Sequence, residues 1–197
     1  LRVTVFSPDD LPLIKGGPGL RRVFLDHLLV SLDARNDALR SEFERAVRQR
    51  NALLKQTKGR LDEAAALTLE VWNSKLVESG EELARRRSDL VSRLEPLVVT
   101  AYGDVAGENQ PITMRYEAHW RDVGLAQALA GVRADELRRG VTLVGPHRDD
   151  LAVQLNDLPS RTHSSQGEQR SLALALRLAG HRLVTESVGT APVLLLD

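Results

Sequence analysis

The feature that most constrains this fold is a long run of apolar residues spaced three, four or seven positions apart in the middle of the chain. This spacing places the side chains on one face of an α-helix. We therefore predict one very long helix from about residue 61, interrupted only by Gly80 and ending near Pro96 to Gly103. The stripe consists of Leu61, Ala65, Leu69, Trp72, Leu76, Leu83, Leu90 and Leu94.

Two shorter helical patterns precede this stripe. In the first, Leu20, Phe24 and Leu28 share a face, and a second with similar spacing runs over residues 39–54. Narrow apolar stripes of this kind suit antiparallel helical hairpins or a short coiled coil. We therefore predict an extended helical arm at residues 20–105.

Strand patterns lie on both sides of the predicted arm. Residues 1–6 and 112–118 alternate between apolar and polar side chains, as a half-buried strand does. Residues 141–144 and 151–155 are further strand candidates, and a short helix is expected over 125–139. The predicted fold class is mostly α with a small β component (α+β).

Composition excludes several classes of function. The 197 residues include no Cys, which rules out disulfides, thiolate metal sites and a cysteine nucleophile. Lysine plus arginine and aspartate plus glutamate number 27 each, so no global positive field points to nucleic acid. No apolar run approaches the ~18 residues of a membrane span, and no signal peptide opens the chain. We expect a soluble, cytoplasmic protein, and the missing initiator Met suggests a portion of something longer.

The strongest functional signal is the start of the apolar helix that follows Ser164. Ser165 is suited to the N-cap position, and with Gly167 two residues later it would present a hydroxyl, backbone N–H groups and the positive end of the helix dipole. These are the groups that bind a polyphosphate. Ser165 together with Glu168 also forms the sequence pattern of a capping box, which any amphipathic helix could use.

A second signal is the apolar run of residues 193–196, which ends in Asp197. An acidic residue at the end of a buried strand is a common place to hold Mg²⁺ through its waters. No complete phosphate loop accompanies it, because Gly140 to Gly145 has the glycine spacing but continues with Pro146 and His147 rather than Lys and Ser or Thr. The chain thus offers one side of an ATP site and lacks the phosphate cradle.

Gly145 to Asp150 forms a compact polar segment in which a His lies beside an Arg and two carboxylates. Such a group could bind phosphate or metal, or act as a base, but residue chemistry alone favours a solvated turn held by its Asp side chains. Positive charge is concentrated elsewhere, over residues 35–60 and in the cluster 85–87. Of these residues, Arg45, Arg48 and Lys55 are our candidates for DNA contact, against the alternative of a solvated helix face.

With these residues in view, the chain resembles the RecF family, ABC/SMC-type ATPases of bacterial recombinational repair. The resemblance implies that Ser165, Gln166, Gly167 and Glu168 form the signature motif, which contacts ATP bound by the opposite subunit of an ATP-dependent homodimer. It also implies that Asp197 is the Walker B aspartate that positions Mg²⁺. The matching segments are Phe6–Leu11, Lys15–Pro18, Leu20–Asp26, Gln49–Lys55, Gly145–Asp150, Ser164–Ala179 and Leu194–Asp197.

The family further implies double-stranded and gapped DNA as partners, with RecO and RecR, and indirectly RecA, in recombinase loading. Residues 1–19 and 106–197 would then be part of the ATPase head, with its signature helix and Walker B strand, and residues 20–105 the arm. The intact protein would be a slow ATPase, and this portion alone would not hydrolyse ATP. Two alternatives remain open: a lobe of another SMC- or ABC-type ATPase, and a non-enzymatic helical interaction module.

Overall fold

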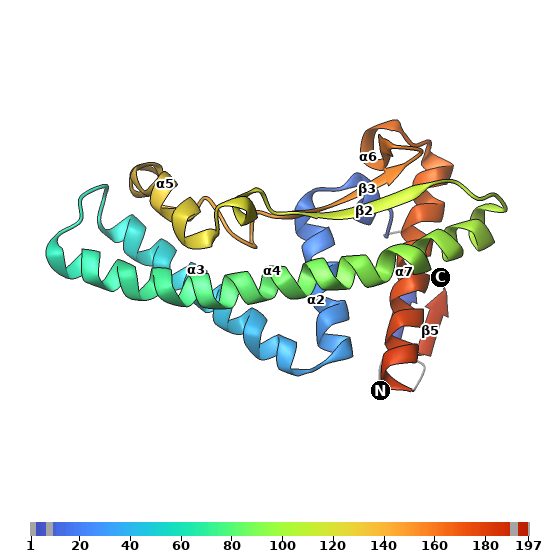
Figure 1. Cartoon of the computed structure of the whole chain (residues 1–197), viewed down its shortest axis with the longest axis horizontal. Helices are drawn as coiled ribbons and strands as arrows, with labels where there is room; N and C mark the ends of the chain where they lie inside the picture. The colour runs from blue at the N-terminus through green and yellow to red at the C-terminus, as the bar shows by residue number, and fades with distance from the viewer. Residues whose placement is uncertain (1–2, 7–9, 190–192, 197) are drawn as a thin grey trace. The chain divides into compact units, whose positions relative to one another are not determined.

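The computed structural model describes residues 3–6, 10–189 and 193–196. Helices predominate, and Figure 1 shows the long helix α4 as one continuous ribbon. The predicted fold class, mostly α with a small β component, is confirmed. The elements are β1 Val3–Phe6, α1 Pro12–Lys15, α2 Pro18–Leu32, α3 Arg35–Gln56, α4 Glu63–Ala106, β2 Ile112–Glu117, the 3-10 helix η2 His119–Asp122, α5 Leu125–Arg139, β3 Asp150–Leu155, β4 Leu158–Pro159, α6 Ser160–His163, α7 Gln166–Val188 and β5 Val193–Leu196.

The chain divides into two compact units. The first unit comprises the described residues within 1–34, 87–117 and 150–197, and the second comprises residues 35–86 and 118–149. Helix α4 contributes its first half to the second unit and its remainder to the first. These boundaries are not those of the predicted head and arm, which remain a prediction about the whole protein.

In the first unit, two small sheets accompany α2, α7 and the end of α4. Strands β2, β3 and β4 form an antiparallel sheet in which Ile112 pairs with Leu155 and Glu117 with Asp150. A two-residue turn at Asn156 and Asp157, both with positive φ, joins β3 to β4. Such a turn matches the twist of a hairpin. Strands β1 and β5 pair in parallel.

The core of the first unit is built mainly from leucines, valines and alanines. Helices α2 and α7 approach closely at Gly180, where an added Cβ would lie 2.9 Å from Leu28 Cδ2. Arg87 forms a buried bidentate ion pair with Asp26, and its guanidinium also donates to the Tyr116 hydroxyl, so α2, α4 and β2 are joined. Desolvation opposes charge on Arg87, but the pairing with Asp26 prevails and raises its pKa.

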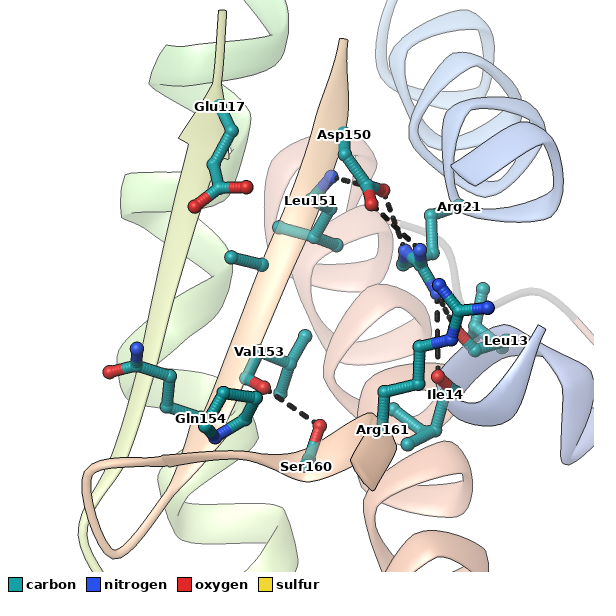
Figure 2. Close-up of a pocket in the computed structure, with 12 residues that line it drawn as sticks. Leu13, Ile14, Arg21, Glu117, Asp150, Leu151, Val153, Gln154, Ser160 and Arg161 are labelled. Atoms are coloured by element: carbon teal, nitrogen blue, oxygen red, sulfur yellow. Dashed lines mark hydrogen bonds and ion pairs between the residues drawn. The ribbon is translucent and has the colours of Figure 1, made fainter. Parts of the chain in front are cut away.

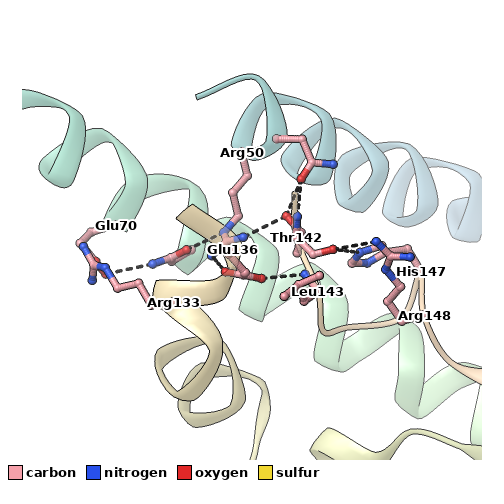
Figure 3. Close-up of polar contacts among 10 residues, drawn as sticks. Arg50, Glu70, Arg133, Glu136, Thr142, Leu143, His147 and Arg148 are labelled. Atoms are coloured by element: carbon pink, nitrogen blue, oxygen red, sulfur yellow. Dashed lines mark hydrogen bonds and ion pairs between the residues drawn. The ribbon is translucent and has the colours of Figure 1, made fainter. Parts of the chain in front are cut away.

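In the second unit, α3, the first half of α4, η2 and α5 enclose a smaller core. Its apolar members include Phe43, Leu54, Leu76 and Leu125, each at most 3% exposed. Beside them Arg50 forms a buried ion pair with Glu136, and both side chains are almost fully excluded from water (Figure 3). Leu69, Leu76, Leu83, Leu90 and Leu94 of the predicted stripe are buried, which confirms the helical spacing.

The long helix runs further than predicted: α4 continues through Gly80 and Pro96 and ends at Ala106, three residues beyond the predicted range of Pro96 to Gly103. Proline removes one helical hydrogen bond and costs about 3 kcal/mol in a helix interior. Here Pro96 is exposed, so water can solvate the carbonyl that loses its partner. Burial of Leu94, Val98 and Tyr102, at ~1.5–3 kcal/mol for a large apolar side chain, offsets the cost and keeps the helix continuous.

The predicted strand at 141–144 is also wrong, since this segment is irregular. Helix α5 ends at Arg139, and its C-cap residue Gly140 adopts the left-handed conformation with φ 65°. The amides that a strand would use are bound by side chains instead: Thr142 N–H donates to Asn51, and Leu143 N–H donates to Glu136. These bonds remove the donors that a neighbouring strand would need.

Candidate functional site

The amino end of α7 has the local structure that the sequence predicted. Ser165 is the N-cap residue, with extended backbone. Its Oγ accepts from Glu168 N–H at 3.3 Å, and its own N–H donates to Glu168 Oε2 at 2.6 Å. A complete capping box is therefore in place, and it leaves the amides of Gln166 and Gly167 in a first turn that has no intrahelical acceptors.

This helix start lies at the surface of the first unit. Ser165, Gln166 and Gly167 are exposed, and Glu168 is half-buried. A Cβ added at Gly167 would meet only Ser165 Oγ, at 4.0 Å, so the space above this residue is open. The four predicted residues are thus brought together, and a large ligand could approach them from solvent.

The exposed start is held in place by buried neighbours. Gln169, 6% exposed, donates from Nε2 to the carbonyl oxygens of Ser160 and Arg161. Ser160 Oγ in turn donates to the carbonyl of Val153 at 2.7 Å, as Figure 2 shows. From Leu172 onward one face of α7 is buried, including Leu172, Leu176 and Leu183. Helix α7 is therefore tied to α6 and β3 just behind its exposed end.

A small pocket of about 210 Å³ lies beside α6 in the first unit (Figure 2). At one side Arg21 makes a bidentate ion pair with Asp150 and donates to the backbone carbonyls of Leu13, Ile14 and Gly16. Arg21 is 4% exposed. Through these bonds its side chain joins α2, which carries it, to α1 and to the start of β3. Sequence reasoning did not single out Arg21, because its partner Asp150 lies far away along the chain.

The segment Gly145 to Asp150 is not the solvated turn that residue chemistry favoured. Asp149 is 4% exposed and accepts from the indole N–H of Trp120 at 2.9 Å. His147 Nε2 lies 3.1 Å from the Thr142 carbonyl, which Arg148 also contacts. Because the carbonyl can only accept, the imidazole donates from Nε2. With Asp150 paired to Arg21, the polar groups of this segment act mainly as internal structural contacts.

The end of α4 adds a buried phenol to the surroundings of α7. Tyr102 is 1% exposed. Burial raises the pKa of its hydroxyl, and the negative charges of Glu168 and Glu108 raise it further. The Tyr102 phenol is therefore neutral at physiological pH, and it adds no negative charge near Glu168.

Asp197, the predicted Mg²⁺ ligand, lies outside the described residues. Within the described ranges no three His, Cys, Asp or Glu side chains are grouped so that they could hold a metal ion. In the same part of the chain, no helix is both long enough and apolar enough to cross a bilayer.

The basic residues proposed for DNA contact lie along α3. Arg45, Arg48 and Lys55 are all exposed, and Arg48 is within 3.5 Å of Glu44. Several other cations of the basic runs are engaged within the chain. Arg50 is buried against Glu136, and Arg40 pairs with Asp37 and Glu44.

The cluster at residues 85–87 is likewise less available than its sequence suggests. Arg85 and Arg86 contact Glu82, and Arg87 is buried against Asp26. Exposed cations of the second unit lie on α3 and the loop that follows it, at Arg45, Arg48, Lys55, Lys58 and Arg60, and also elsewhere, at Lys75, Arg121, Arg138, Arg139 and Arg148.

Comparison with known proteins places the chain among characterised relatives. It is 44% identical to the DNA replication and repair protein RecF of Streptomyces avermitilis over 212 aligned residues, which cover 100% of this chain and 56% of the relative. It is 43% identical to the protein of the same name from Leifsonia xyli subsp. xyli over 217 residues, covering 98% of this chain and 56% of the relative. No family model matches the chain.

Two solved structures that resemble this chain are also of RecF proteins. The recombination mediator protein RecF-ATPrS in the RecFOR pathway matches with a TM-score of 0.90 and 28% identity, covering 100% of this chain and 55% of that one. RecF-ATP in the same pathway matches with a TM-score of 0.89 and 29% identity, covering 99% and 54%. Along its whole length the chain is therefore homologous to the RecF proteins, and it spans a little over half of theirs.

Proposed function

We propose that this chain supplies the signature side of an ATP-dependent RecF homodimer. The observation that carries the proposal is the exposed, rigidly supported start of α7, where Ser165, Gln166 and Gly167 face solvent. The match to structures of RecF with nucleotide supports ATP as the ligand. In this proposal ATP is bound by the phosphate loop of one subunit and is capped by the signature helix of the other.

The chemistry follows from the helix start. The Ser165 hydroxyl and the amides of Gln166 and Gly167 donate to the terminal phosphate, and the helix dipole favours its negative charge. Glu168 holds the N-cap backbone in the required position. Mg²⁺, positioned through Asp197, would neutralise part of the phosphate charge in the nucleotide's own subunit. The chain spans only part of its relatives, so hydrolysis needs the rest of the protein.

Because ATP forms part of the interface, its binding energy stabilises the dimer, and hydrolysis releases the subunits. We propose that this cycle operates in the cytoplasm on double-stranded and gapped DNA. RecO and RecR, the other proteins named in the RecFOR pathway of the structural relatives, would then help RecF to load RecA. The exposed cations of α3, namely Arg45, Arg48 and Lys55, would contact the phosphate backbone.

The first test separates phosphate binding from helix capping at Ser165. Ser165→Asp keeps a good N-cap, because Asp accepts the Glu168 amide, but its charge repels a phosphate. Ser165→Asn is the matched control, since Asn caps equally well without charge. In the intact protein, sedimentation with ATP should show the dimer lost in Ser165→Asp and much less affected in Ser165→Asn.

A second pair of variants tests access to the helix start. Gly167→Leu should block an approaching subunit, and Gly131→Leu is its control, because Gly131 also lies in an exposed helical position with nothing near its added Cβ. Leucine is favoured over glycine in a helix by up to ~1 kcal/mol, so neither variant should unfold the protein. Normal ATP-dependent dimerisation by Gly167→Leu and Ser165→Asp would leave Ser165 as a cap alone.

The second candidate function is a helical interaction module without a role for ATP. The specific observation on its side is the complete capping box, which already gives Ser165 and Glu168 a structural purpose. Under this alternative the intact protein would associate to the same degree with and without nucleotide. The sedimentation experiment therefore distinguishes the two candidates directly.

DNA contact is tested by replacing Arg45, Arg48 and Lys55 together with Gln. The slope of log K against log salt is negative, and each lost phosphate contact should make it shallower by about 0.9, so three lost contacts predict a slope that is shallower by about 2.7. Arg40→Gln is the control, since Arg40 already pairs with Asp37 and Glu44. An unchanged slope in the triple variant would assign these side chains to surface solvation.

A further inference from the structure

The one-turn helix α6 joins the sheet of the first unit to the exposed start of α7. Only Ser164 and Ser165 separate His163, the last residue of α6, from Gln166, the first residue of α7. The position of α6 therefore sets where the Ser165 hydroxyl and the first amides of α7 lie. The contacts that hold α6 decide how precisely these groups are placed.

The first residue of α6 is anchored in the sheet. Ser160 is 2% exposed, and its Oγ donates to the carbonyl of Val153 in β3 at 2.7 Å (Figure 2). Its own carbonyl accepts from Ser164 N–H at 3.3 Å and from Gln169 Nε2 at 3.2 Å. One buried residue thus connects β3, α6 and α7.

Gln169 completes this connection from the side of α7. Its amide nitrogen has two hydrogens, and Nε2 lies 3.2 Å from the carbonyl oxygen of Ser160 and 3.2 Å from that of Arg161. The Arg161 carbonyl belongs to the end of a helix, where carbonyls lack intrahelical donors. The bonds of Ser160 and Gln169 together form a network that holds the backbone of α6 against the start of α7.

Gln169 departs from the pattern of the helix that carries it. The other buried positions of α7 are filled by leucine, alanine, valine and glycine, and Gln169 is the only buried polar side chain in this helix, all of which the structure describes. A buried amide costs free energy unless it is hydrogen-bonded, whereas an apolar side chain would continue the stripe. Departures of this kind are typical of functional sites, and this one lies four residues from Ser165.

We infer that Gln169 and Ser160 are positioning residues for ATP-dependent dimerisation, which hold Ser165 in the geometry that meets the nucleotide of the opposite subunit. The inference rests on the proposed function of the α7 start. Both residues are at most 6% exposed, so they act through the backbone of α6 and α7 rather than on the phosphate. A misplacement of about 1 Å can cost ~100-fold at such a site, so the dimer should be more sensitive to this network than the fold is.

The first test is Gln169→Met in the intact protein. Methionine is also unbranched, favours a helix and suits a buried stripe, but it cannot donate to the two carbonyls of α6. Sedimentation with ATP should show a dimer dissociation constant raised by about tenfold or more. Ser160→Ala, which loses the bond to Val153, should act in the same direction. It serves as the second variant if circular dichroism shows that Gln169→Met folds poorly.

Val184→Ala is the matched control for a loss of stability alone. Val184 is 2% exposed in the same helix, but it lies about 22 Å further along the axis than Gln169, at 1.5 Å per residue. This variant should lower the thermal unfolding midpoint and leave ATP-dependent dimerisation normal. The affinity of the monomer for a fluorescent ATP analogue, measured below the concentration at which dimers form, should be unchanged in all three variants.

A double variant shows whether Gln169 acts through Ser165. Ser165→Ala removes the hydroxyl that the network positions. Gln169→Met should therefore weaken the dimer of Ser165→Ala by a smaller factor than it weakens the dimer of the unmodified protein. Equal factors in the two backgrounds would mean independent effects and would overturn the inference.

Other results separate this inference from the proposed function. Normal dimerisation by Gln169→Met and Ser160→Ala, with Ser165→Asp defective, would overturn the inference and leave the proposed function standing. The inference would also be overturned if Val184→Ala weakened the dimer as much, or if the monomer lost affinity for the nucleotide in parallel. Absence of an ATP-dependent dimer in the unmodified protein would overturn both.

Discussion

The buried ion pair between Arg50 and Glu136 offers the sharpest test of how the second unit is held together. Glu136→Ala removes a side chain that is fully buried and that accepts from Arg50 at 2.5 Å and from Leu143 N–H at 2.8 Å. The guanidinium of Arg50, also about 1% exposed, would stay in the core without its anion. The backbone amide of Leu143 would lose its acceptor as well.

The magnitude follows from these two losses. Removing one partner of a buried pair costs about 3–5 kcal/mol, because an uncompensated charge remains in a medium of low dielectric. An orphaned buried amide costs about 1–3 kcal/mol by itself. The two contributions overlap, since water entering the space left by Glu136 would solvate both groups, so we expect a total of about 4 kcal/mol.

Native-state hydrogen exchange on the intact protein measures this effect where it occurs. A loss of about 4 kcal/mol should lower the protection factors of core amides in α3 and α5 by almost three orders of magnitude. Amides of α7, in the first unit, serve as the internal control. Replacing both partners, as Arg50→Met with Glu136→Leu, should restore part of the protection, because no buried charge is left.

A protection loss below tenfold in Glu136→Ala would refute this reasoning. It would show that water already reaches the pair or that Arg50 finds another acceptor. A double variant that is as unstable as the two single changes added together would refute it too, since independent effects would mean that the two charges do not interact.

Three further predictions concern local packing and pH. Gly180→Leu should destabilise the first unit by about 1–3 kcal/mol, because its side chain would overlap Leu28 of α2, and an unchanged unfolding midpoint would contradict this contact. Pro96→Ala should stabilise α4 by up to ~3 kcal/mol by restoring a helical hydrogen bond, which thermal unfolding would detect as a higher midpoint. Hydrogen bonding from Arg85 lowers the pKa of Glu82 from 4.5 to about 2, so its stabilisation is present above pH 4.5 and is lost as the pH falls toward 2. Because Glu82 is one third exposed, we expect Glu82→Gln to cost only about 0.5 kcal/mol at neutral pH and nothing near pH 2, and a pH-independent difference would contradict the pairing.

The candidate site was accessible from sequence because its determinants are local. Ser165 and Glu168 are three residues apart, and a capping box needs only that separation and the start of a helix. The support behind it was not accessible, because Gln169 reaches α6 and Ser160 reaches β3 through contacts that no periodicity records. Arg21 was missed for the same reason, since its partner Asp150 lies 129 residues away.

Basic residues show the same division more clearly. Arg45, Arg48 and Arg50 carry equal charge and lie within six residues of sequence, yet the first two are exposed and the third is buried against Glu136. A count of charges treats them alike. Only the direction in which each side chain leaves α3 decides which of them can meet a phosphate.

By itself, the sequence determined the elements whose signals repeat along the chain: the apolar stripe of α4, the alternation of β2 and the capped start of α7. The tertiary structure decided where those signals were overridden. Helix α4 passes Pro96 because buried neighbours on both sides offset one lost hydrogen bond, and residues 141–144 are irregular because Asn51 and Glu136 bind the amides that a strand would use. Both outcomes depend on free energies from residues distant in sequence, which meet only after folding.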